Sequence, residues 1–196
     1  MDVQRLDPAR LAEASAVLAR AFHDDPAWLW VIPEEERRAS LLPWLFQIGF
    51  DVTTADVWTT TGPILGAARW LPPGRQPVRL GATLRALVAT PFRLGSATGR
   101  FLAYGRGVEL LRARVAPGPH WYLAGIGVDP PEQHRGIGSA LLRPGMEGAA
   151  ADGVPCVLLT NNEANVAFYN RHGFEVVDEG RTPEDGPRAW AMVKLP

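Results

Sequence analysis

Cysteine and lysine are nearly absent from this sequence of 196 residues, which contains one of each. A single cysteine, Cys156, excludes an intramolecular disulfide and a cysteine-based metal cluster, and no metal site is expected. Cys156 stands in an apolar run, where a buried and unreactive thiol is expected. Because arginine carries nearly all the positive charge and Ala, Gly and Pro are abundant, we attribute the single lysine, Lys194, to genomic base composition.

Long hydrophobic runs and an excess of one charge are missing as well. No stretch approaches the roughly 18 consecutive apolar residues of a membrane span, and the N-terminus lacks the apolar core of a signal peptide. The formal net charge of -1 gives no broad attraction to nucleic acid or to an anionic membrane. We therefore expect a cytoplasmic protein with no nucleic-acid or membrane partner, folded as one domain over residues 1–196.

The residue patterns predict an α/β domain with a mixed sheet. Strands are expected at residues 3–6, 56–60, 64–71, 120–128, 154–160, 174–178 and 189–194. Helices are expected from Asp7 and Pro8, a favourable helix start, to about residue 23, and at residues 33–50, 136–151 and 165–172. Between residues 79 and 115 the pattern is helical but interrupted near Thr90 and Gly105, which predicts two or three helices there.

A glycine-rich turn between a predicted strand and a predicted helix is the main candidate for a binding site. Backbone N–H groups converge on a phosphate in such a turn, and the helix that follows adds positive potential. The turn alone is equally compatible with a structural role. It differs from the dinucleotide-binding fingerprint, because no third glycine follows at the required spacing, and from a P-loop, because the Lys-Ser/Thr pair is missing. Its residues are Gln133, His134, Arg135, Gly136, Ile137, Gly138 and Ser139, with Arg143 further along the predicted helix.

Residues 127–142 resemble the acetyl-CoA-binding motif of the GNAT N-acetyltransferase superfamily, which reads Gln or Arg, two residues, Gly, one residue, and Gly or Ala. A second element of that superfamily, residues 165–174, follows at the expected distance. The similarity is clear from about residue 119 to the C-terminus, patchy before it and slight over residues 72–118. Residues 119–123, 144–147 and 186–192 look like the group that includes puromycin N-acetyltransferase, and residues 21–26 are similar to it as well. His23 and Asp25 depart from that group, so puromycin itself is not implied.

The resemblance implies a GNAT-type fold, a mixed and largely antiparallel sheet flanked by helices, in which one pair of parallel strands splays apart. That pair is expected at residues 120–128 and 154–160, with acetyl-CoA lying in the gap as the acyl donor. The residues that the resemblance implies as cofactor contacts are Ile126, Gly127, Val128, the turn from Gln133 to Ser139, Asn161, Asn165 and Phe168.

Tyr169 is the catalytic acid that the resemblance implies. A phenol with an ordinary pKa near 10 can protonate the departing CoA thiolate at neutral pH. By helical spacing alone, Tyr169 and Phe168 would be ordinary core aromatics, and the motif upstream favours the functional role. Many GNAT enzymes carry a glutamate on the strand that corresponds to residues 120–128, but this strand has no carboxylate. The general base therefore stays open. An amine with a lowered pKa, or a water chain, needs no dedicated base, and His120, Asp24 and Asp25 are candidates by location alone.

The sequence thus predicts an acyl-CoA-dependent N-acetyltransferase, monomeric or homodimeric, that acetylates a primary amine of a small molecule. Two alternatives remain open: acetylation of a protein N-terminus or lysine, and a non-catalytic acyl-CoA-binding sensor. Seven tryptophans are many for this length, and most are expected in the core because large aromatics bury much area. The residues expected to contact the acceptor are His23, Asp24, Trp28, Trp121 and Trp190.

Overall fold

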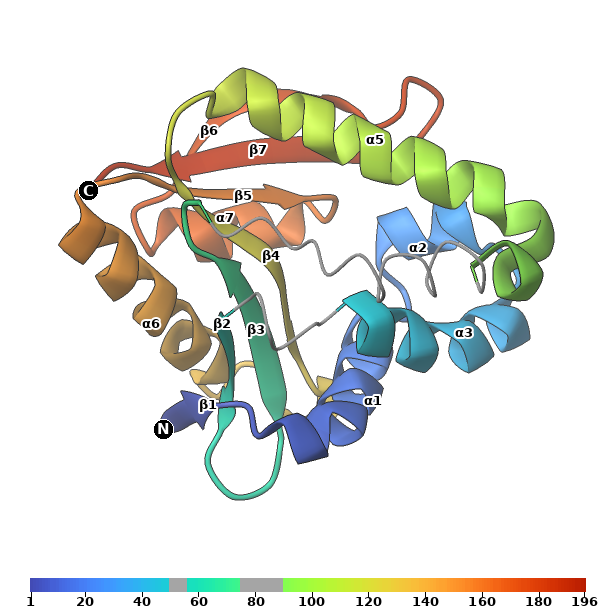
Figure 1. Ribbon diagram of the computed structural model, residues 1–196, viewed down its shortest axis with the longest axis horizontal. Helices are drawn as coiled ribbons and strands as arrows, with labels where there is room; N and C mark the ends of the chain where they lie inside the picture. The colour runs from blue at the N-terminus through green and yellow to red at the C-terminus, as the bar shows by residue number, and fades with distance from the viewer. Residues whose placement is uncertain (50–55, 75–89) are drawn as a thin grey trace.

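A seven-stranded sheet in the order β1-β2-β3-β4-β5-β7-β6 forms the centre of the computed structural model, which describes residues 1–49, 56–74 and 90–196 (Figure 1). Among the described strands, β4 and β5 are the one parallel pair, and all other neighbours are antiparallel. The mixed, largely antiparallel sheet predicted from the sequence is therefore confirmed. The strands are β1 (Val3–Arg5), β2 (Asp56–Thr60), β3 (Gly66–Leu71), β4 (Trp121–Val128), β5 (Cys156–Thr160), β6 (Glu175–Arg181) and β7 (Arg188–Lys194).

Helices cover both faces of this sheet (Figure 1). One face carries α1 (Leu11–Ala21), α2 (Pro26–Val31), α3 (Glu35–Gly49) and α5 (Thr98–Val115). The other face carries α6 (Ile137–Asp152) and α7 (Ala164–Asn170). None of the helices in the described ranges is long and apolar enough to cross a membrane.

The central strands are buried on both faces, and successive side chains alternate between two cores. On β4, Trp121 and Leu123 pack in the core beneath α6, whereas Tyr122 between them packs on the face of α5. On β3, Ala67 packs with α1 and α3, and Ala68 packs beneath α6. This period-two alternation explains why the central strands read as continuous apolar runs in the sequence.

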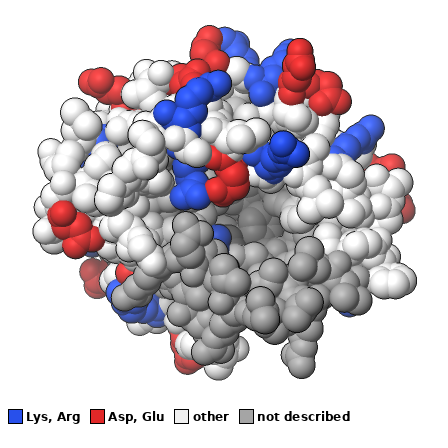
Figure 2. Space-filling view, turned by 45° about the horizontal axis from the view of Figure 1, so that its top comes forward, with Lys and Arg blue, Asp and Glu red and all other residues white. Residues whose placement is uncertain are grey.

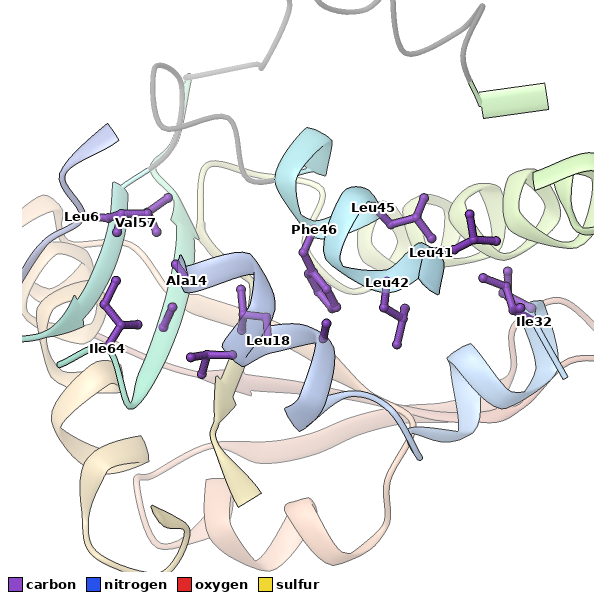
Figure 3. Close-up of a cluster of buried hydrophobic side chains, with 14 of the residues drawn as sticks. Leu6, Ala14, Leu18, Ile32, Leu41, Leu42, Leu45, Phe46, Val57 and Ile64 are labelled. Carbon is purple, nitrogen blue, oxygen red and sulfur yellow. The ribbon is translucent and has the colours of Figure 1, made fainter. Parts of the chain in front are cut away.

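The core between α1, α3 and the sheet is made of close-packed aliphatic and aromatic side chains (Figure 3). Leu18 of α1 and Leu42 of α3 are fully buried, and Phe46 of α3 packs on Phe22 with ring centroids 5.2 Å apart. Truncating a buried leucine to alanine typically costs about 2–5 kcal/mol, so these contacts hold the N-terminal helices on the sheet.

Two tryptophans and two glycines fix the position of α6 on the opposite face. A Cβ at Gly145 would lie 2.1 Å from the Trp70 ring, and a Cβ at Gly148 would lie 2.6 Å from the Trp121 ring. The two indoles meet edge to face with centroids 6.4 Å apart. Because both rings require a bare helix surface, Gly145 and Gly148 are the residues that allow α6 to approach the sheet.

Two Asp-Pro pairs start helices on the N-terminal face in the same way. Asp7 accepts a hydrogen bond of 2.9 Å from the Ala9 N–H at the start of the 3₁₀ turn η1 (Pro8–Arg10), which leads into α1. Asp25 accepts one of 2.9 Å from the Ala27 N–H at the start of α2. The aspartate satisfies a backbone donor of the first turn, and the proline that follows is preset for helical geometry.

The structure differs from the predicted elements in two places. Helix α2 was not predicted, because its six residues are too few to show a helical period. Helix α5 continues through Gly105, where a break was predicted. A Cβ at the nearby Gly107 would lie 3.3 Å from Thr182, so this glycine serves close packing against the β6–β7 hairpin. The rest of the helical pattern predicted over residues 79–89 lies outside the described residues.

Candidate functional site

The parallel strands β4 and β5 separate after three residue pairs. Their register contains Trp121 with Cys156, Tyr122 with Val157 and Leu123 with Leu158. Beyond Leu123, β4 stays paired with β3 as far as Val128 and runs away from β5 (Figure 1). The pairing with β3 shifts at Arg69/Trp70, so that Ala124 is the extra residue of a bulge, and a bulge bends the strand that carries it.

This separation leaves one backbone edge of β4 open to a ligand. Residues 124–126 are half-buried, whereas residues 121–123, which are paired on both sides, are buried. Gly127 has no room for a side chain, because a Cβ there would lie 2.9 Å from Ala21 and from Leu18 of α1. Helix α1 therefore supports the predicted contact residues Ile126, Gly127 and Val128 from one side, and their polar backbone edge faces the gap.

The glycine-rich turn lies where β4 leads into α6. His134 has φ +64° and Gly136 has φ +79°, and α6 begins at Ile137 directly after this left-handed glycine. The first intrahelical bond runs from the Ala140 N–H to the Gly136 carbonyl. The N–H groups of Ile137, Gly138 and Ser139 thus stand at the open end of the helix, where they can bind an anion.

Side chains around the turn hold its shape and leave its outer surface exposed. The Gln133 amide donates to the Val128 carbonyl at 3.2 Å, which ties the turn to the end of β4. Arg135 forms an ion pair with Glu132 and is largely exposed, as are His134 and Gly136. An exposed arginine beside free backbone donors suits a solvent-accessible phosphate group.

Helix α7 packs directly on the start of α6. A Cβ at Gly138 would lie 3.2 Å from Cζ of Phe168, so the aromatic ring lies against the glycine. The ring nitrogens of His172 lie 2.8 Å from the Phe168 carbonyl and 2.9 Å from the Ser139 hydroxyl. A neutral imidazole that donates from Nδ1 and accepts at Nε2 satisfies both bonds. The structure thereby brings Gly138, Ser139 and Phe168 together.

Tyr169 is buried, and its ring packs with Phe168 and Phe174 in the core on the α6 face. Burial raises the pKa of Tyr169 well above its ordinary value, and the nearby Asp25 and Tyr122 raise it further. Asp25 and Tyr122 belong to the opposite face of the sheet. Tyr169 therefore interacts electrostatically with groups on the opposite face of the sheet.

The face opposite α7 carries a second group of polar residues near this gap. The Tyr104 hydroxyl of α5 donates to Oδ1 of Asn161 at 2.6 Å, and Nδ2 of Asn161 donates to the Arg188 carbonyl at 2.7 Å. Burial and the nearby Asp25 and Tyr122 raise the pKa of Tyr104, and burial raises the pKa of Tyr122 to about 12. The three tyrosines of the chain, Tyr104, Tyr122 and Tyr169, are thus gathered around one region.

The structure places the residues predicted to contact the acceptor in different parts of the fold. Trp28 is half-buried on α2 beside Phe46 and Phe101, on the same face as Tyr104. Trp190 is buried on β7 opposite Thr160, at the end of β5, with the Arg188 guanidinium 5.0 Å from its ring centroid. Trp28 thus lies on the α5 face of the sheet. Trp190 alternates along β7 with Ala189 and Ala191, which pack against α5, so its side chain points to the other face.

Trp121 and Asp24 do not fit the predicted role. Trp121 is buried beneath α6, and its indole N–H donates to Asp152 at 2.8 Å, so it belongs to the core on the far face. Asp24 is 85% exposed and lies 3.9 Å from Arg38, while the next residue, Asp25, is half-buried. His23 is half-buried on the same loop, and His120 lies 2.7 Å from the Gly118 carbonyl at the start of β4.

Tyr104 and Tyr122 are residues of this region that the sequence did not indicate. Tyr104 lies in a segment without a recognisable motif, and Tyr122 looks like any aromatic residue of a buried strand. The chain has only three tyrosines. This small number was the one feature of the sequence that could have drawn attention to Tyr104 and Tyr122. Cys156 is buried as expected, and burial raises the pKa of its thiol to about 11, which disfavours the reactive thiolate.

Comparison of the sequence with a family model identifies the family of this protein. The model of the acetyltransferase (GNAT) family matches residues 68–174, which is more than half of the chain and includes both sequence motifs. The chain belongs to the GNAT acetyltransferase family. As a GNAT protein it is an acyl-CoA-dependent N-acetyltransferase, and acetyl-CoA is its acyl donor.

Solved structures share the GNAT fold over nearly the whole chain. A Corynebacterium glutamicum protein described as histone acetyltransferase HPA2 and related acetyltransferase is 24% identical, with a TM-score of 0.68 and coverage of 99% of this chain and 95% of the other. The Thermoplasma acidophilum PaiA N-acetyltransferase, solved with coenzyme A, is 14% identical, with a TM-score of 0.60 and coverage of 100% and 98%. The Drosophila melanogaster polyamine N-acetyltransferase, which forms N-acetylagmatine, is 16% identical, with a TM-score of 0.62 and coverage of 100% and 99%.

Proposed function

We propose that this GNAT enzyme transfers the acetyl group of acetyl-CoA to a primary amine of a small molecule, with Tyr169 as the catalytic acid. The observation that carries the proposal is the position of Tyr169. Its ring is buried on the α7 side, and its hydroxyl is coupled to Asp25 and Tyr122 on the other face. A donor held in the β4–β5 gap would thus meet the acid from one side and the acceptor from the other.

The donor would be held by backbone groups along two successive segments. The open edge of Ile126, Gly127 and Val128 would bind the pantetheine arm, and an N–H there would polarise the thioester carbonyl. The turn from Gln133 to Ser139 would bind the pyrophosphate at the start of α6. The remaining proposed contacts with the cofactor are Asn161, Asn165 and Phe168.

Tyr169 would supply the proton that the leaving thiolate requires. Because the pKa of Tyr169 is raised above its ordinary value, the phenol stays protonated throughout the physiological range and is available to donate. Protonation of the thiolate as the C–S bond breaks makes the reverse reaction unfavourable. General-acid catalysis of this kind contributes about 10²–10⁴-fold to a rate.

A small amine is favoured over a protein substrate by the surroundings of the acceptor face. Asp25, Tyr104 and Trp28 are each half-buried between α2 and α5, and two of these three positions carry aromatic rings. Figure 2 shows acidic and basic side chains mixed on the face that is turned forward, without a broad field of one sign. Several structural relatives act on small amines by their names, among them the Drosophila enzyme that forms N-acetylagmatine. The sequence similarity to the puromycin N-acetyltransferase group supports the same substrate class.

Acetyl-CoA binding followed by thiol release tests the proposal. Calorimetry with acetyl-CoA should show saturable binding, and the free thiol of CoA should then appear when a primary amine is added. Binding without thiol release from any amine of a panel of alkylamines, arylamines and peptides would favour the sensor. Thiol release with peptides alone would favour a protein substrate.

A further inference from the structure

Asp25 is a half-buried carboxylate without a cationic partner among the described residues. One of its oxygens accepts a hydrogen bond from the Ala27 N–H at 2.9 Å, which caps α2. The neighbouring Asp24, by contrast, is exposed and lies 3.9 Å from the Arg38 guanidinium and 4.0 Å from His23. A carboxylate withheld from water without an ion pair costs folding free energy, so its retention calls for another reason.

Two phenols from different elements interact with Asp25. Its charge acts on Tyr104 of α5 and on Tyr169 of α7, and both of these also interact with Tyr122 of β4. Asp25 precedes α2, which packs against α5 through Trp28 and Phe101, and Tyr104 of α5 bonds Asn161 directly after β5. Asp25 therefore lies on the face where α5 meets the end of β5, and the neighbouring strand β4 carries no carboxylate.

We propose that Asp25 binds the ammonium group of the acceptor and accepts its proton, so that the enzyme selects small amines that are cationic at neutral pH. This inference rests on the proposed acetyl transfer and adds to it the general base and the charge of the acceptor. An ammonium ion would supply the missing partner of the carboxylate, and the surrounding aromatic rings would favour a cation as well.

Two groups, Asp25 and Tyr169, account for every proton that moves in the proposed reaction. The Asp25 carboxylate takes one proton from R–NH₃⁺, and the lone pair thus freed attacks the thioester carbonyl carbon. As the C–N bond forms and the C–S bond breaks, Tyr169 gives its proton to the thiolate. The Tyr169 phenolate takes back the second proton from the new N–H₂⁺ centre, and Asp25 releases its proton to solvent.

Burial makes the Asp25 carboxylate more basic than an exposed aspartate. Desolvation raises its pKa to about 6, against the opposing effect of hydrogen bonds from the Ala27 and Trp28 N–H groups. The acid is then mostly ionised at neutral pH and is a better proton acceptor than an ordinary carboxylate. The charged or titratable groups around it are Tyr104 and Tyr169, which stay protonated, Arg38 on α3, and His23 and Asp24 on its own loop.

Arg38 fixes the loop that carries Asp25. Its buried guanidinium donates to the carbonyls of His23, Ile32 and Pro33 at 2.6, 3.0 and 3.0 Å. These bonds brace both ends of α2 against α3. Asp25 therefore meets the acceptor from a rigid support, as a binding group requires.

The test compares Asp25→Asn with the matched control Asp7→Asn. Both aspartates precede a proline and cap a helical turn through a 2.9 Å bond, but Asp7 is exposed. Asparagine caps as well as aspartate, so both variants keep the cap and lose the charge. Thiol release is measured with 2-phenylethylamine, agmatine and spermidine, which are protonated at neutral pH, and with 4-methylaniline, which is neutral there.

We expect Asp25→Asn to lower kcat/KM for the alkylamines by about 10²-fold or more and to affect 4-methylaniline much less. Asp7→Asn should stay within about twofold of the wild type, and acetyl-CoA affinity should be unchanged in both variants. In the wild type, kcat/KM for an alkylamine should fall as the pH drops below about 6. This measurement needs no variant, so it does not depend on whether a variant folds.

Equal losses for alkylamines and 4-methylaniline, or no loss at all, would overturn the role of Asp25 and leave the acetyl transfer intact. A wild-type profile that is flat through pH 6 would overturn it as well. Acetyl-CoA binding without thiol release from any of these amines in the wild type would instead contradict the proposed function, and the inference with it.

Discussion

The hydroxyl of Ser139 and Nε2 of His172 lie 2.9 Å apart, and this bond joins the start of α6 to the end of α7. The same imidazole bonds the Phe168 carbonyl at 2.8 Å through its other nitrogen. The turn that precedes α6 is proposed to hold the pyrophosphate, and α7 carries Tyr169. In the proposed mechanism, His172 thereby sets the position of Tyr169 relative to the donor.

Loss of the His172 side chain should disturb binding and catalysis together. We expect His172→Ala to raise KM for acetyl-CoA and to lower kcat, each by up to about tenfold, because one hydrogen bond contributes roughly 1 kcal/mol. Steady-state kinetics with varied acetyl-CoA measures both constants. A change in thermal stability with both constants unaltered would show that the bond is structural only.

Removal of the Tyr169 hydroxyl should affect turnover but not donor binding. We expect Tyr169→Phe to lower kcat by about 10²–10⁴-fold, because the thiolate then leaves without a proton donor. The phenylalanine ring keeps the contacts with Phe168 and Phe174, so the Kd of acetyl-CoA from calorimetry should stay close to that of the wild type. Unchanged turnover would exclude Tyr169 as the acid.

A methyl group added to α6 should reveal how closely this helix packs on the sheet. Gly145→Ala places a Cβ 2.1 Å from the Trp70 ring, and overpacking of this kind typically costs about 1–3 kcal/mol. The matched control is Gly105→Ala on α5, where nothing lies within 4 Å of the added Cβ. Alanine should stabilise that helix by about 0.5–1 kcal/mol. Urea denaturation of both variants measures the free energies of unfolding, and equal values would contradict the packing of α6 on Trp70.

The charge of Asp25 should destabilise the fold above its pKa. Because the folded pKa is raised from 3.8 to about 6, the folded state binds more protons than the unfolded state between these values. Stability therefore falls as the pH rises through this window. The free energy of unfolding of Asp25→Asn, relative to the wild type, should rise by up to about 3 kcal/mol between pH 4 and pH 7. A difference independent of pH would contradict the burial of an unpaired carboxylate.

The sheet and the glycine-rich turn before α6 were predictable because they are encoded locally. The apolar runs that became β4 and β5 alternate between two cores, and the turn at Gly136 needs a left-handed residue where the sequence has glycine. The Asp7 cap was predicted for the same reason. Each of these features depends on residues within a few positions of one another.

The acceptor side was less predictable because it is assembled from distant segments. Asp25, Tyr104, Tyr122 and Tyr169 come from four elements, and no spacing in the sequence links them. Two adjacent aspartates, Asp24 and Asp25, look alike in the sequence, and only the packing of α2 buries one and exposes the other. The continuity of α5 through Gly105 likewise depends on its contacts with the β6–β7 hairpin.

Acetyl transfer to a small amine is tested by following release of the CoA thiol from acetyl-CoA continuously, with and without a primary alkylamine. Thiol release by the wild type should depend on the amine and saturate with it, and the N-acetylated amine should form in equal amount. If thiol release stays at the rate without amine for every alkylamine and arylamine, under saturating acetyl-CoA, the enzyme does not acetylate small amines.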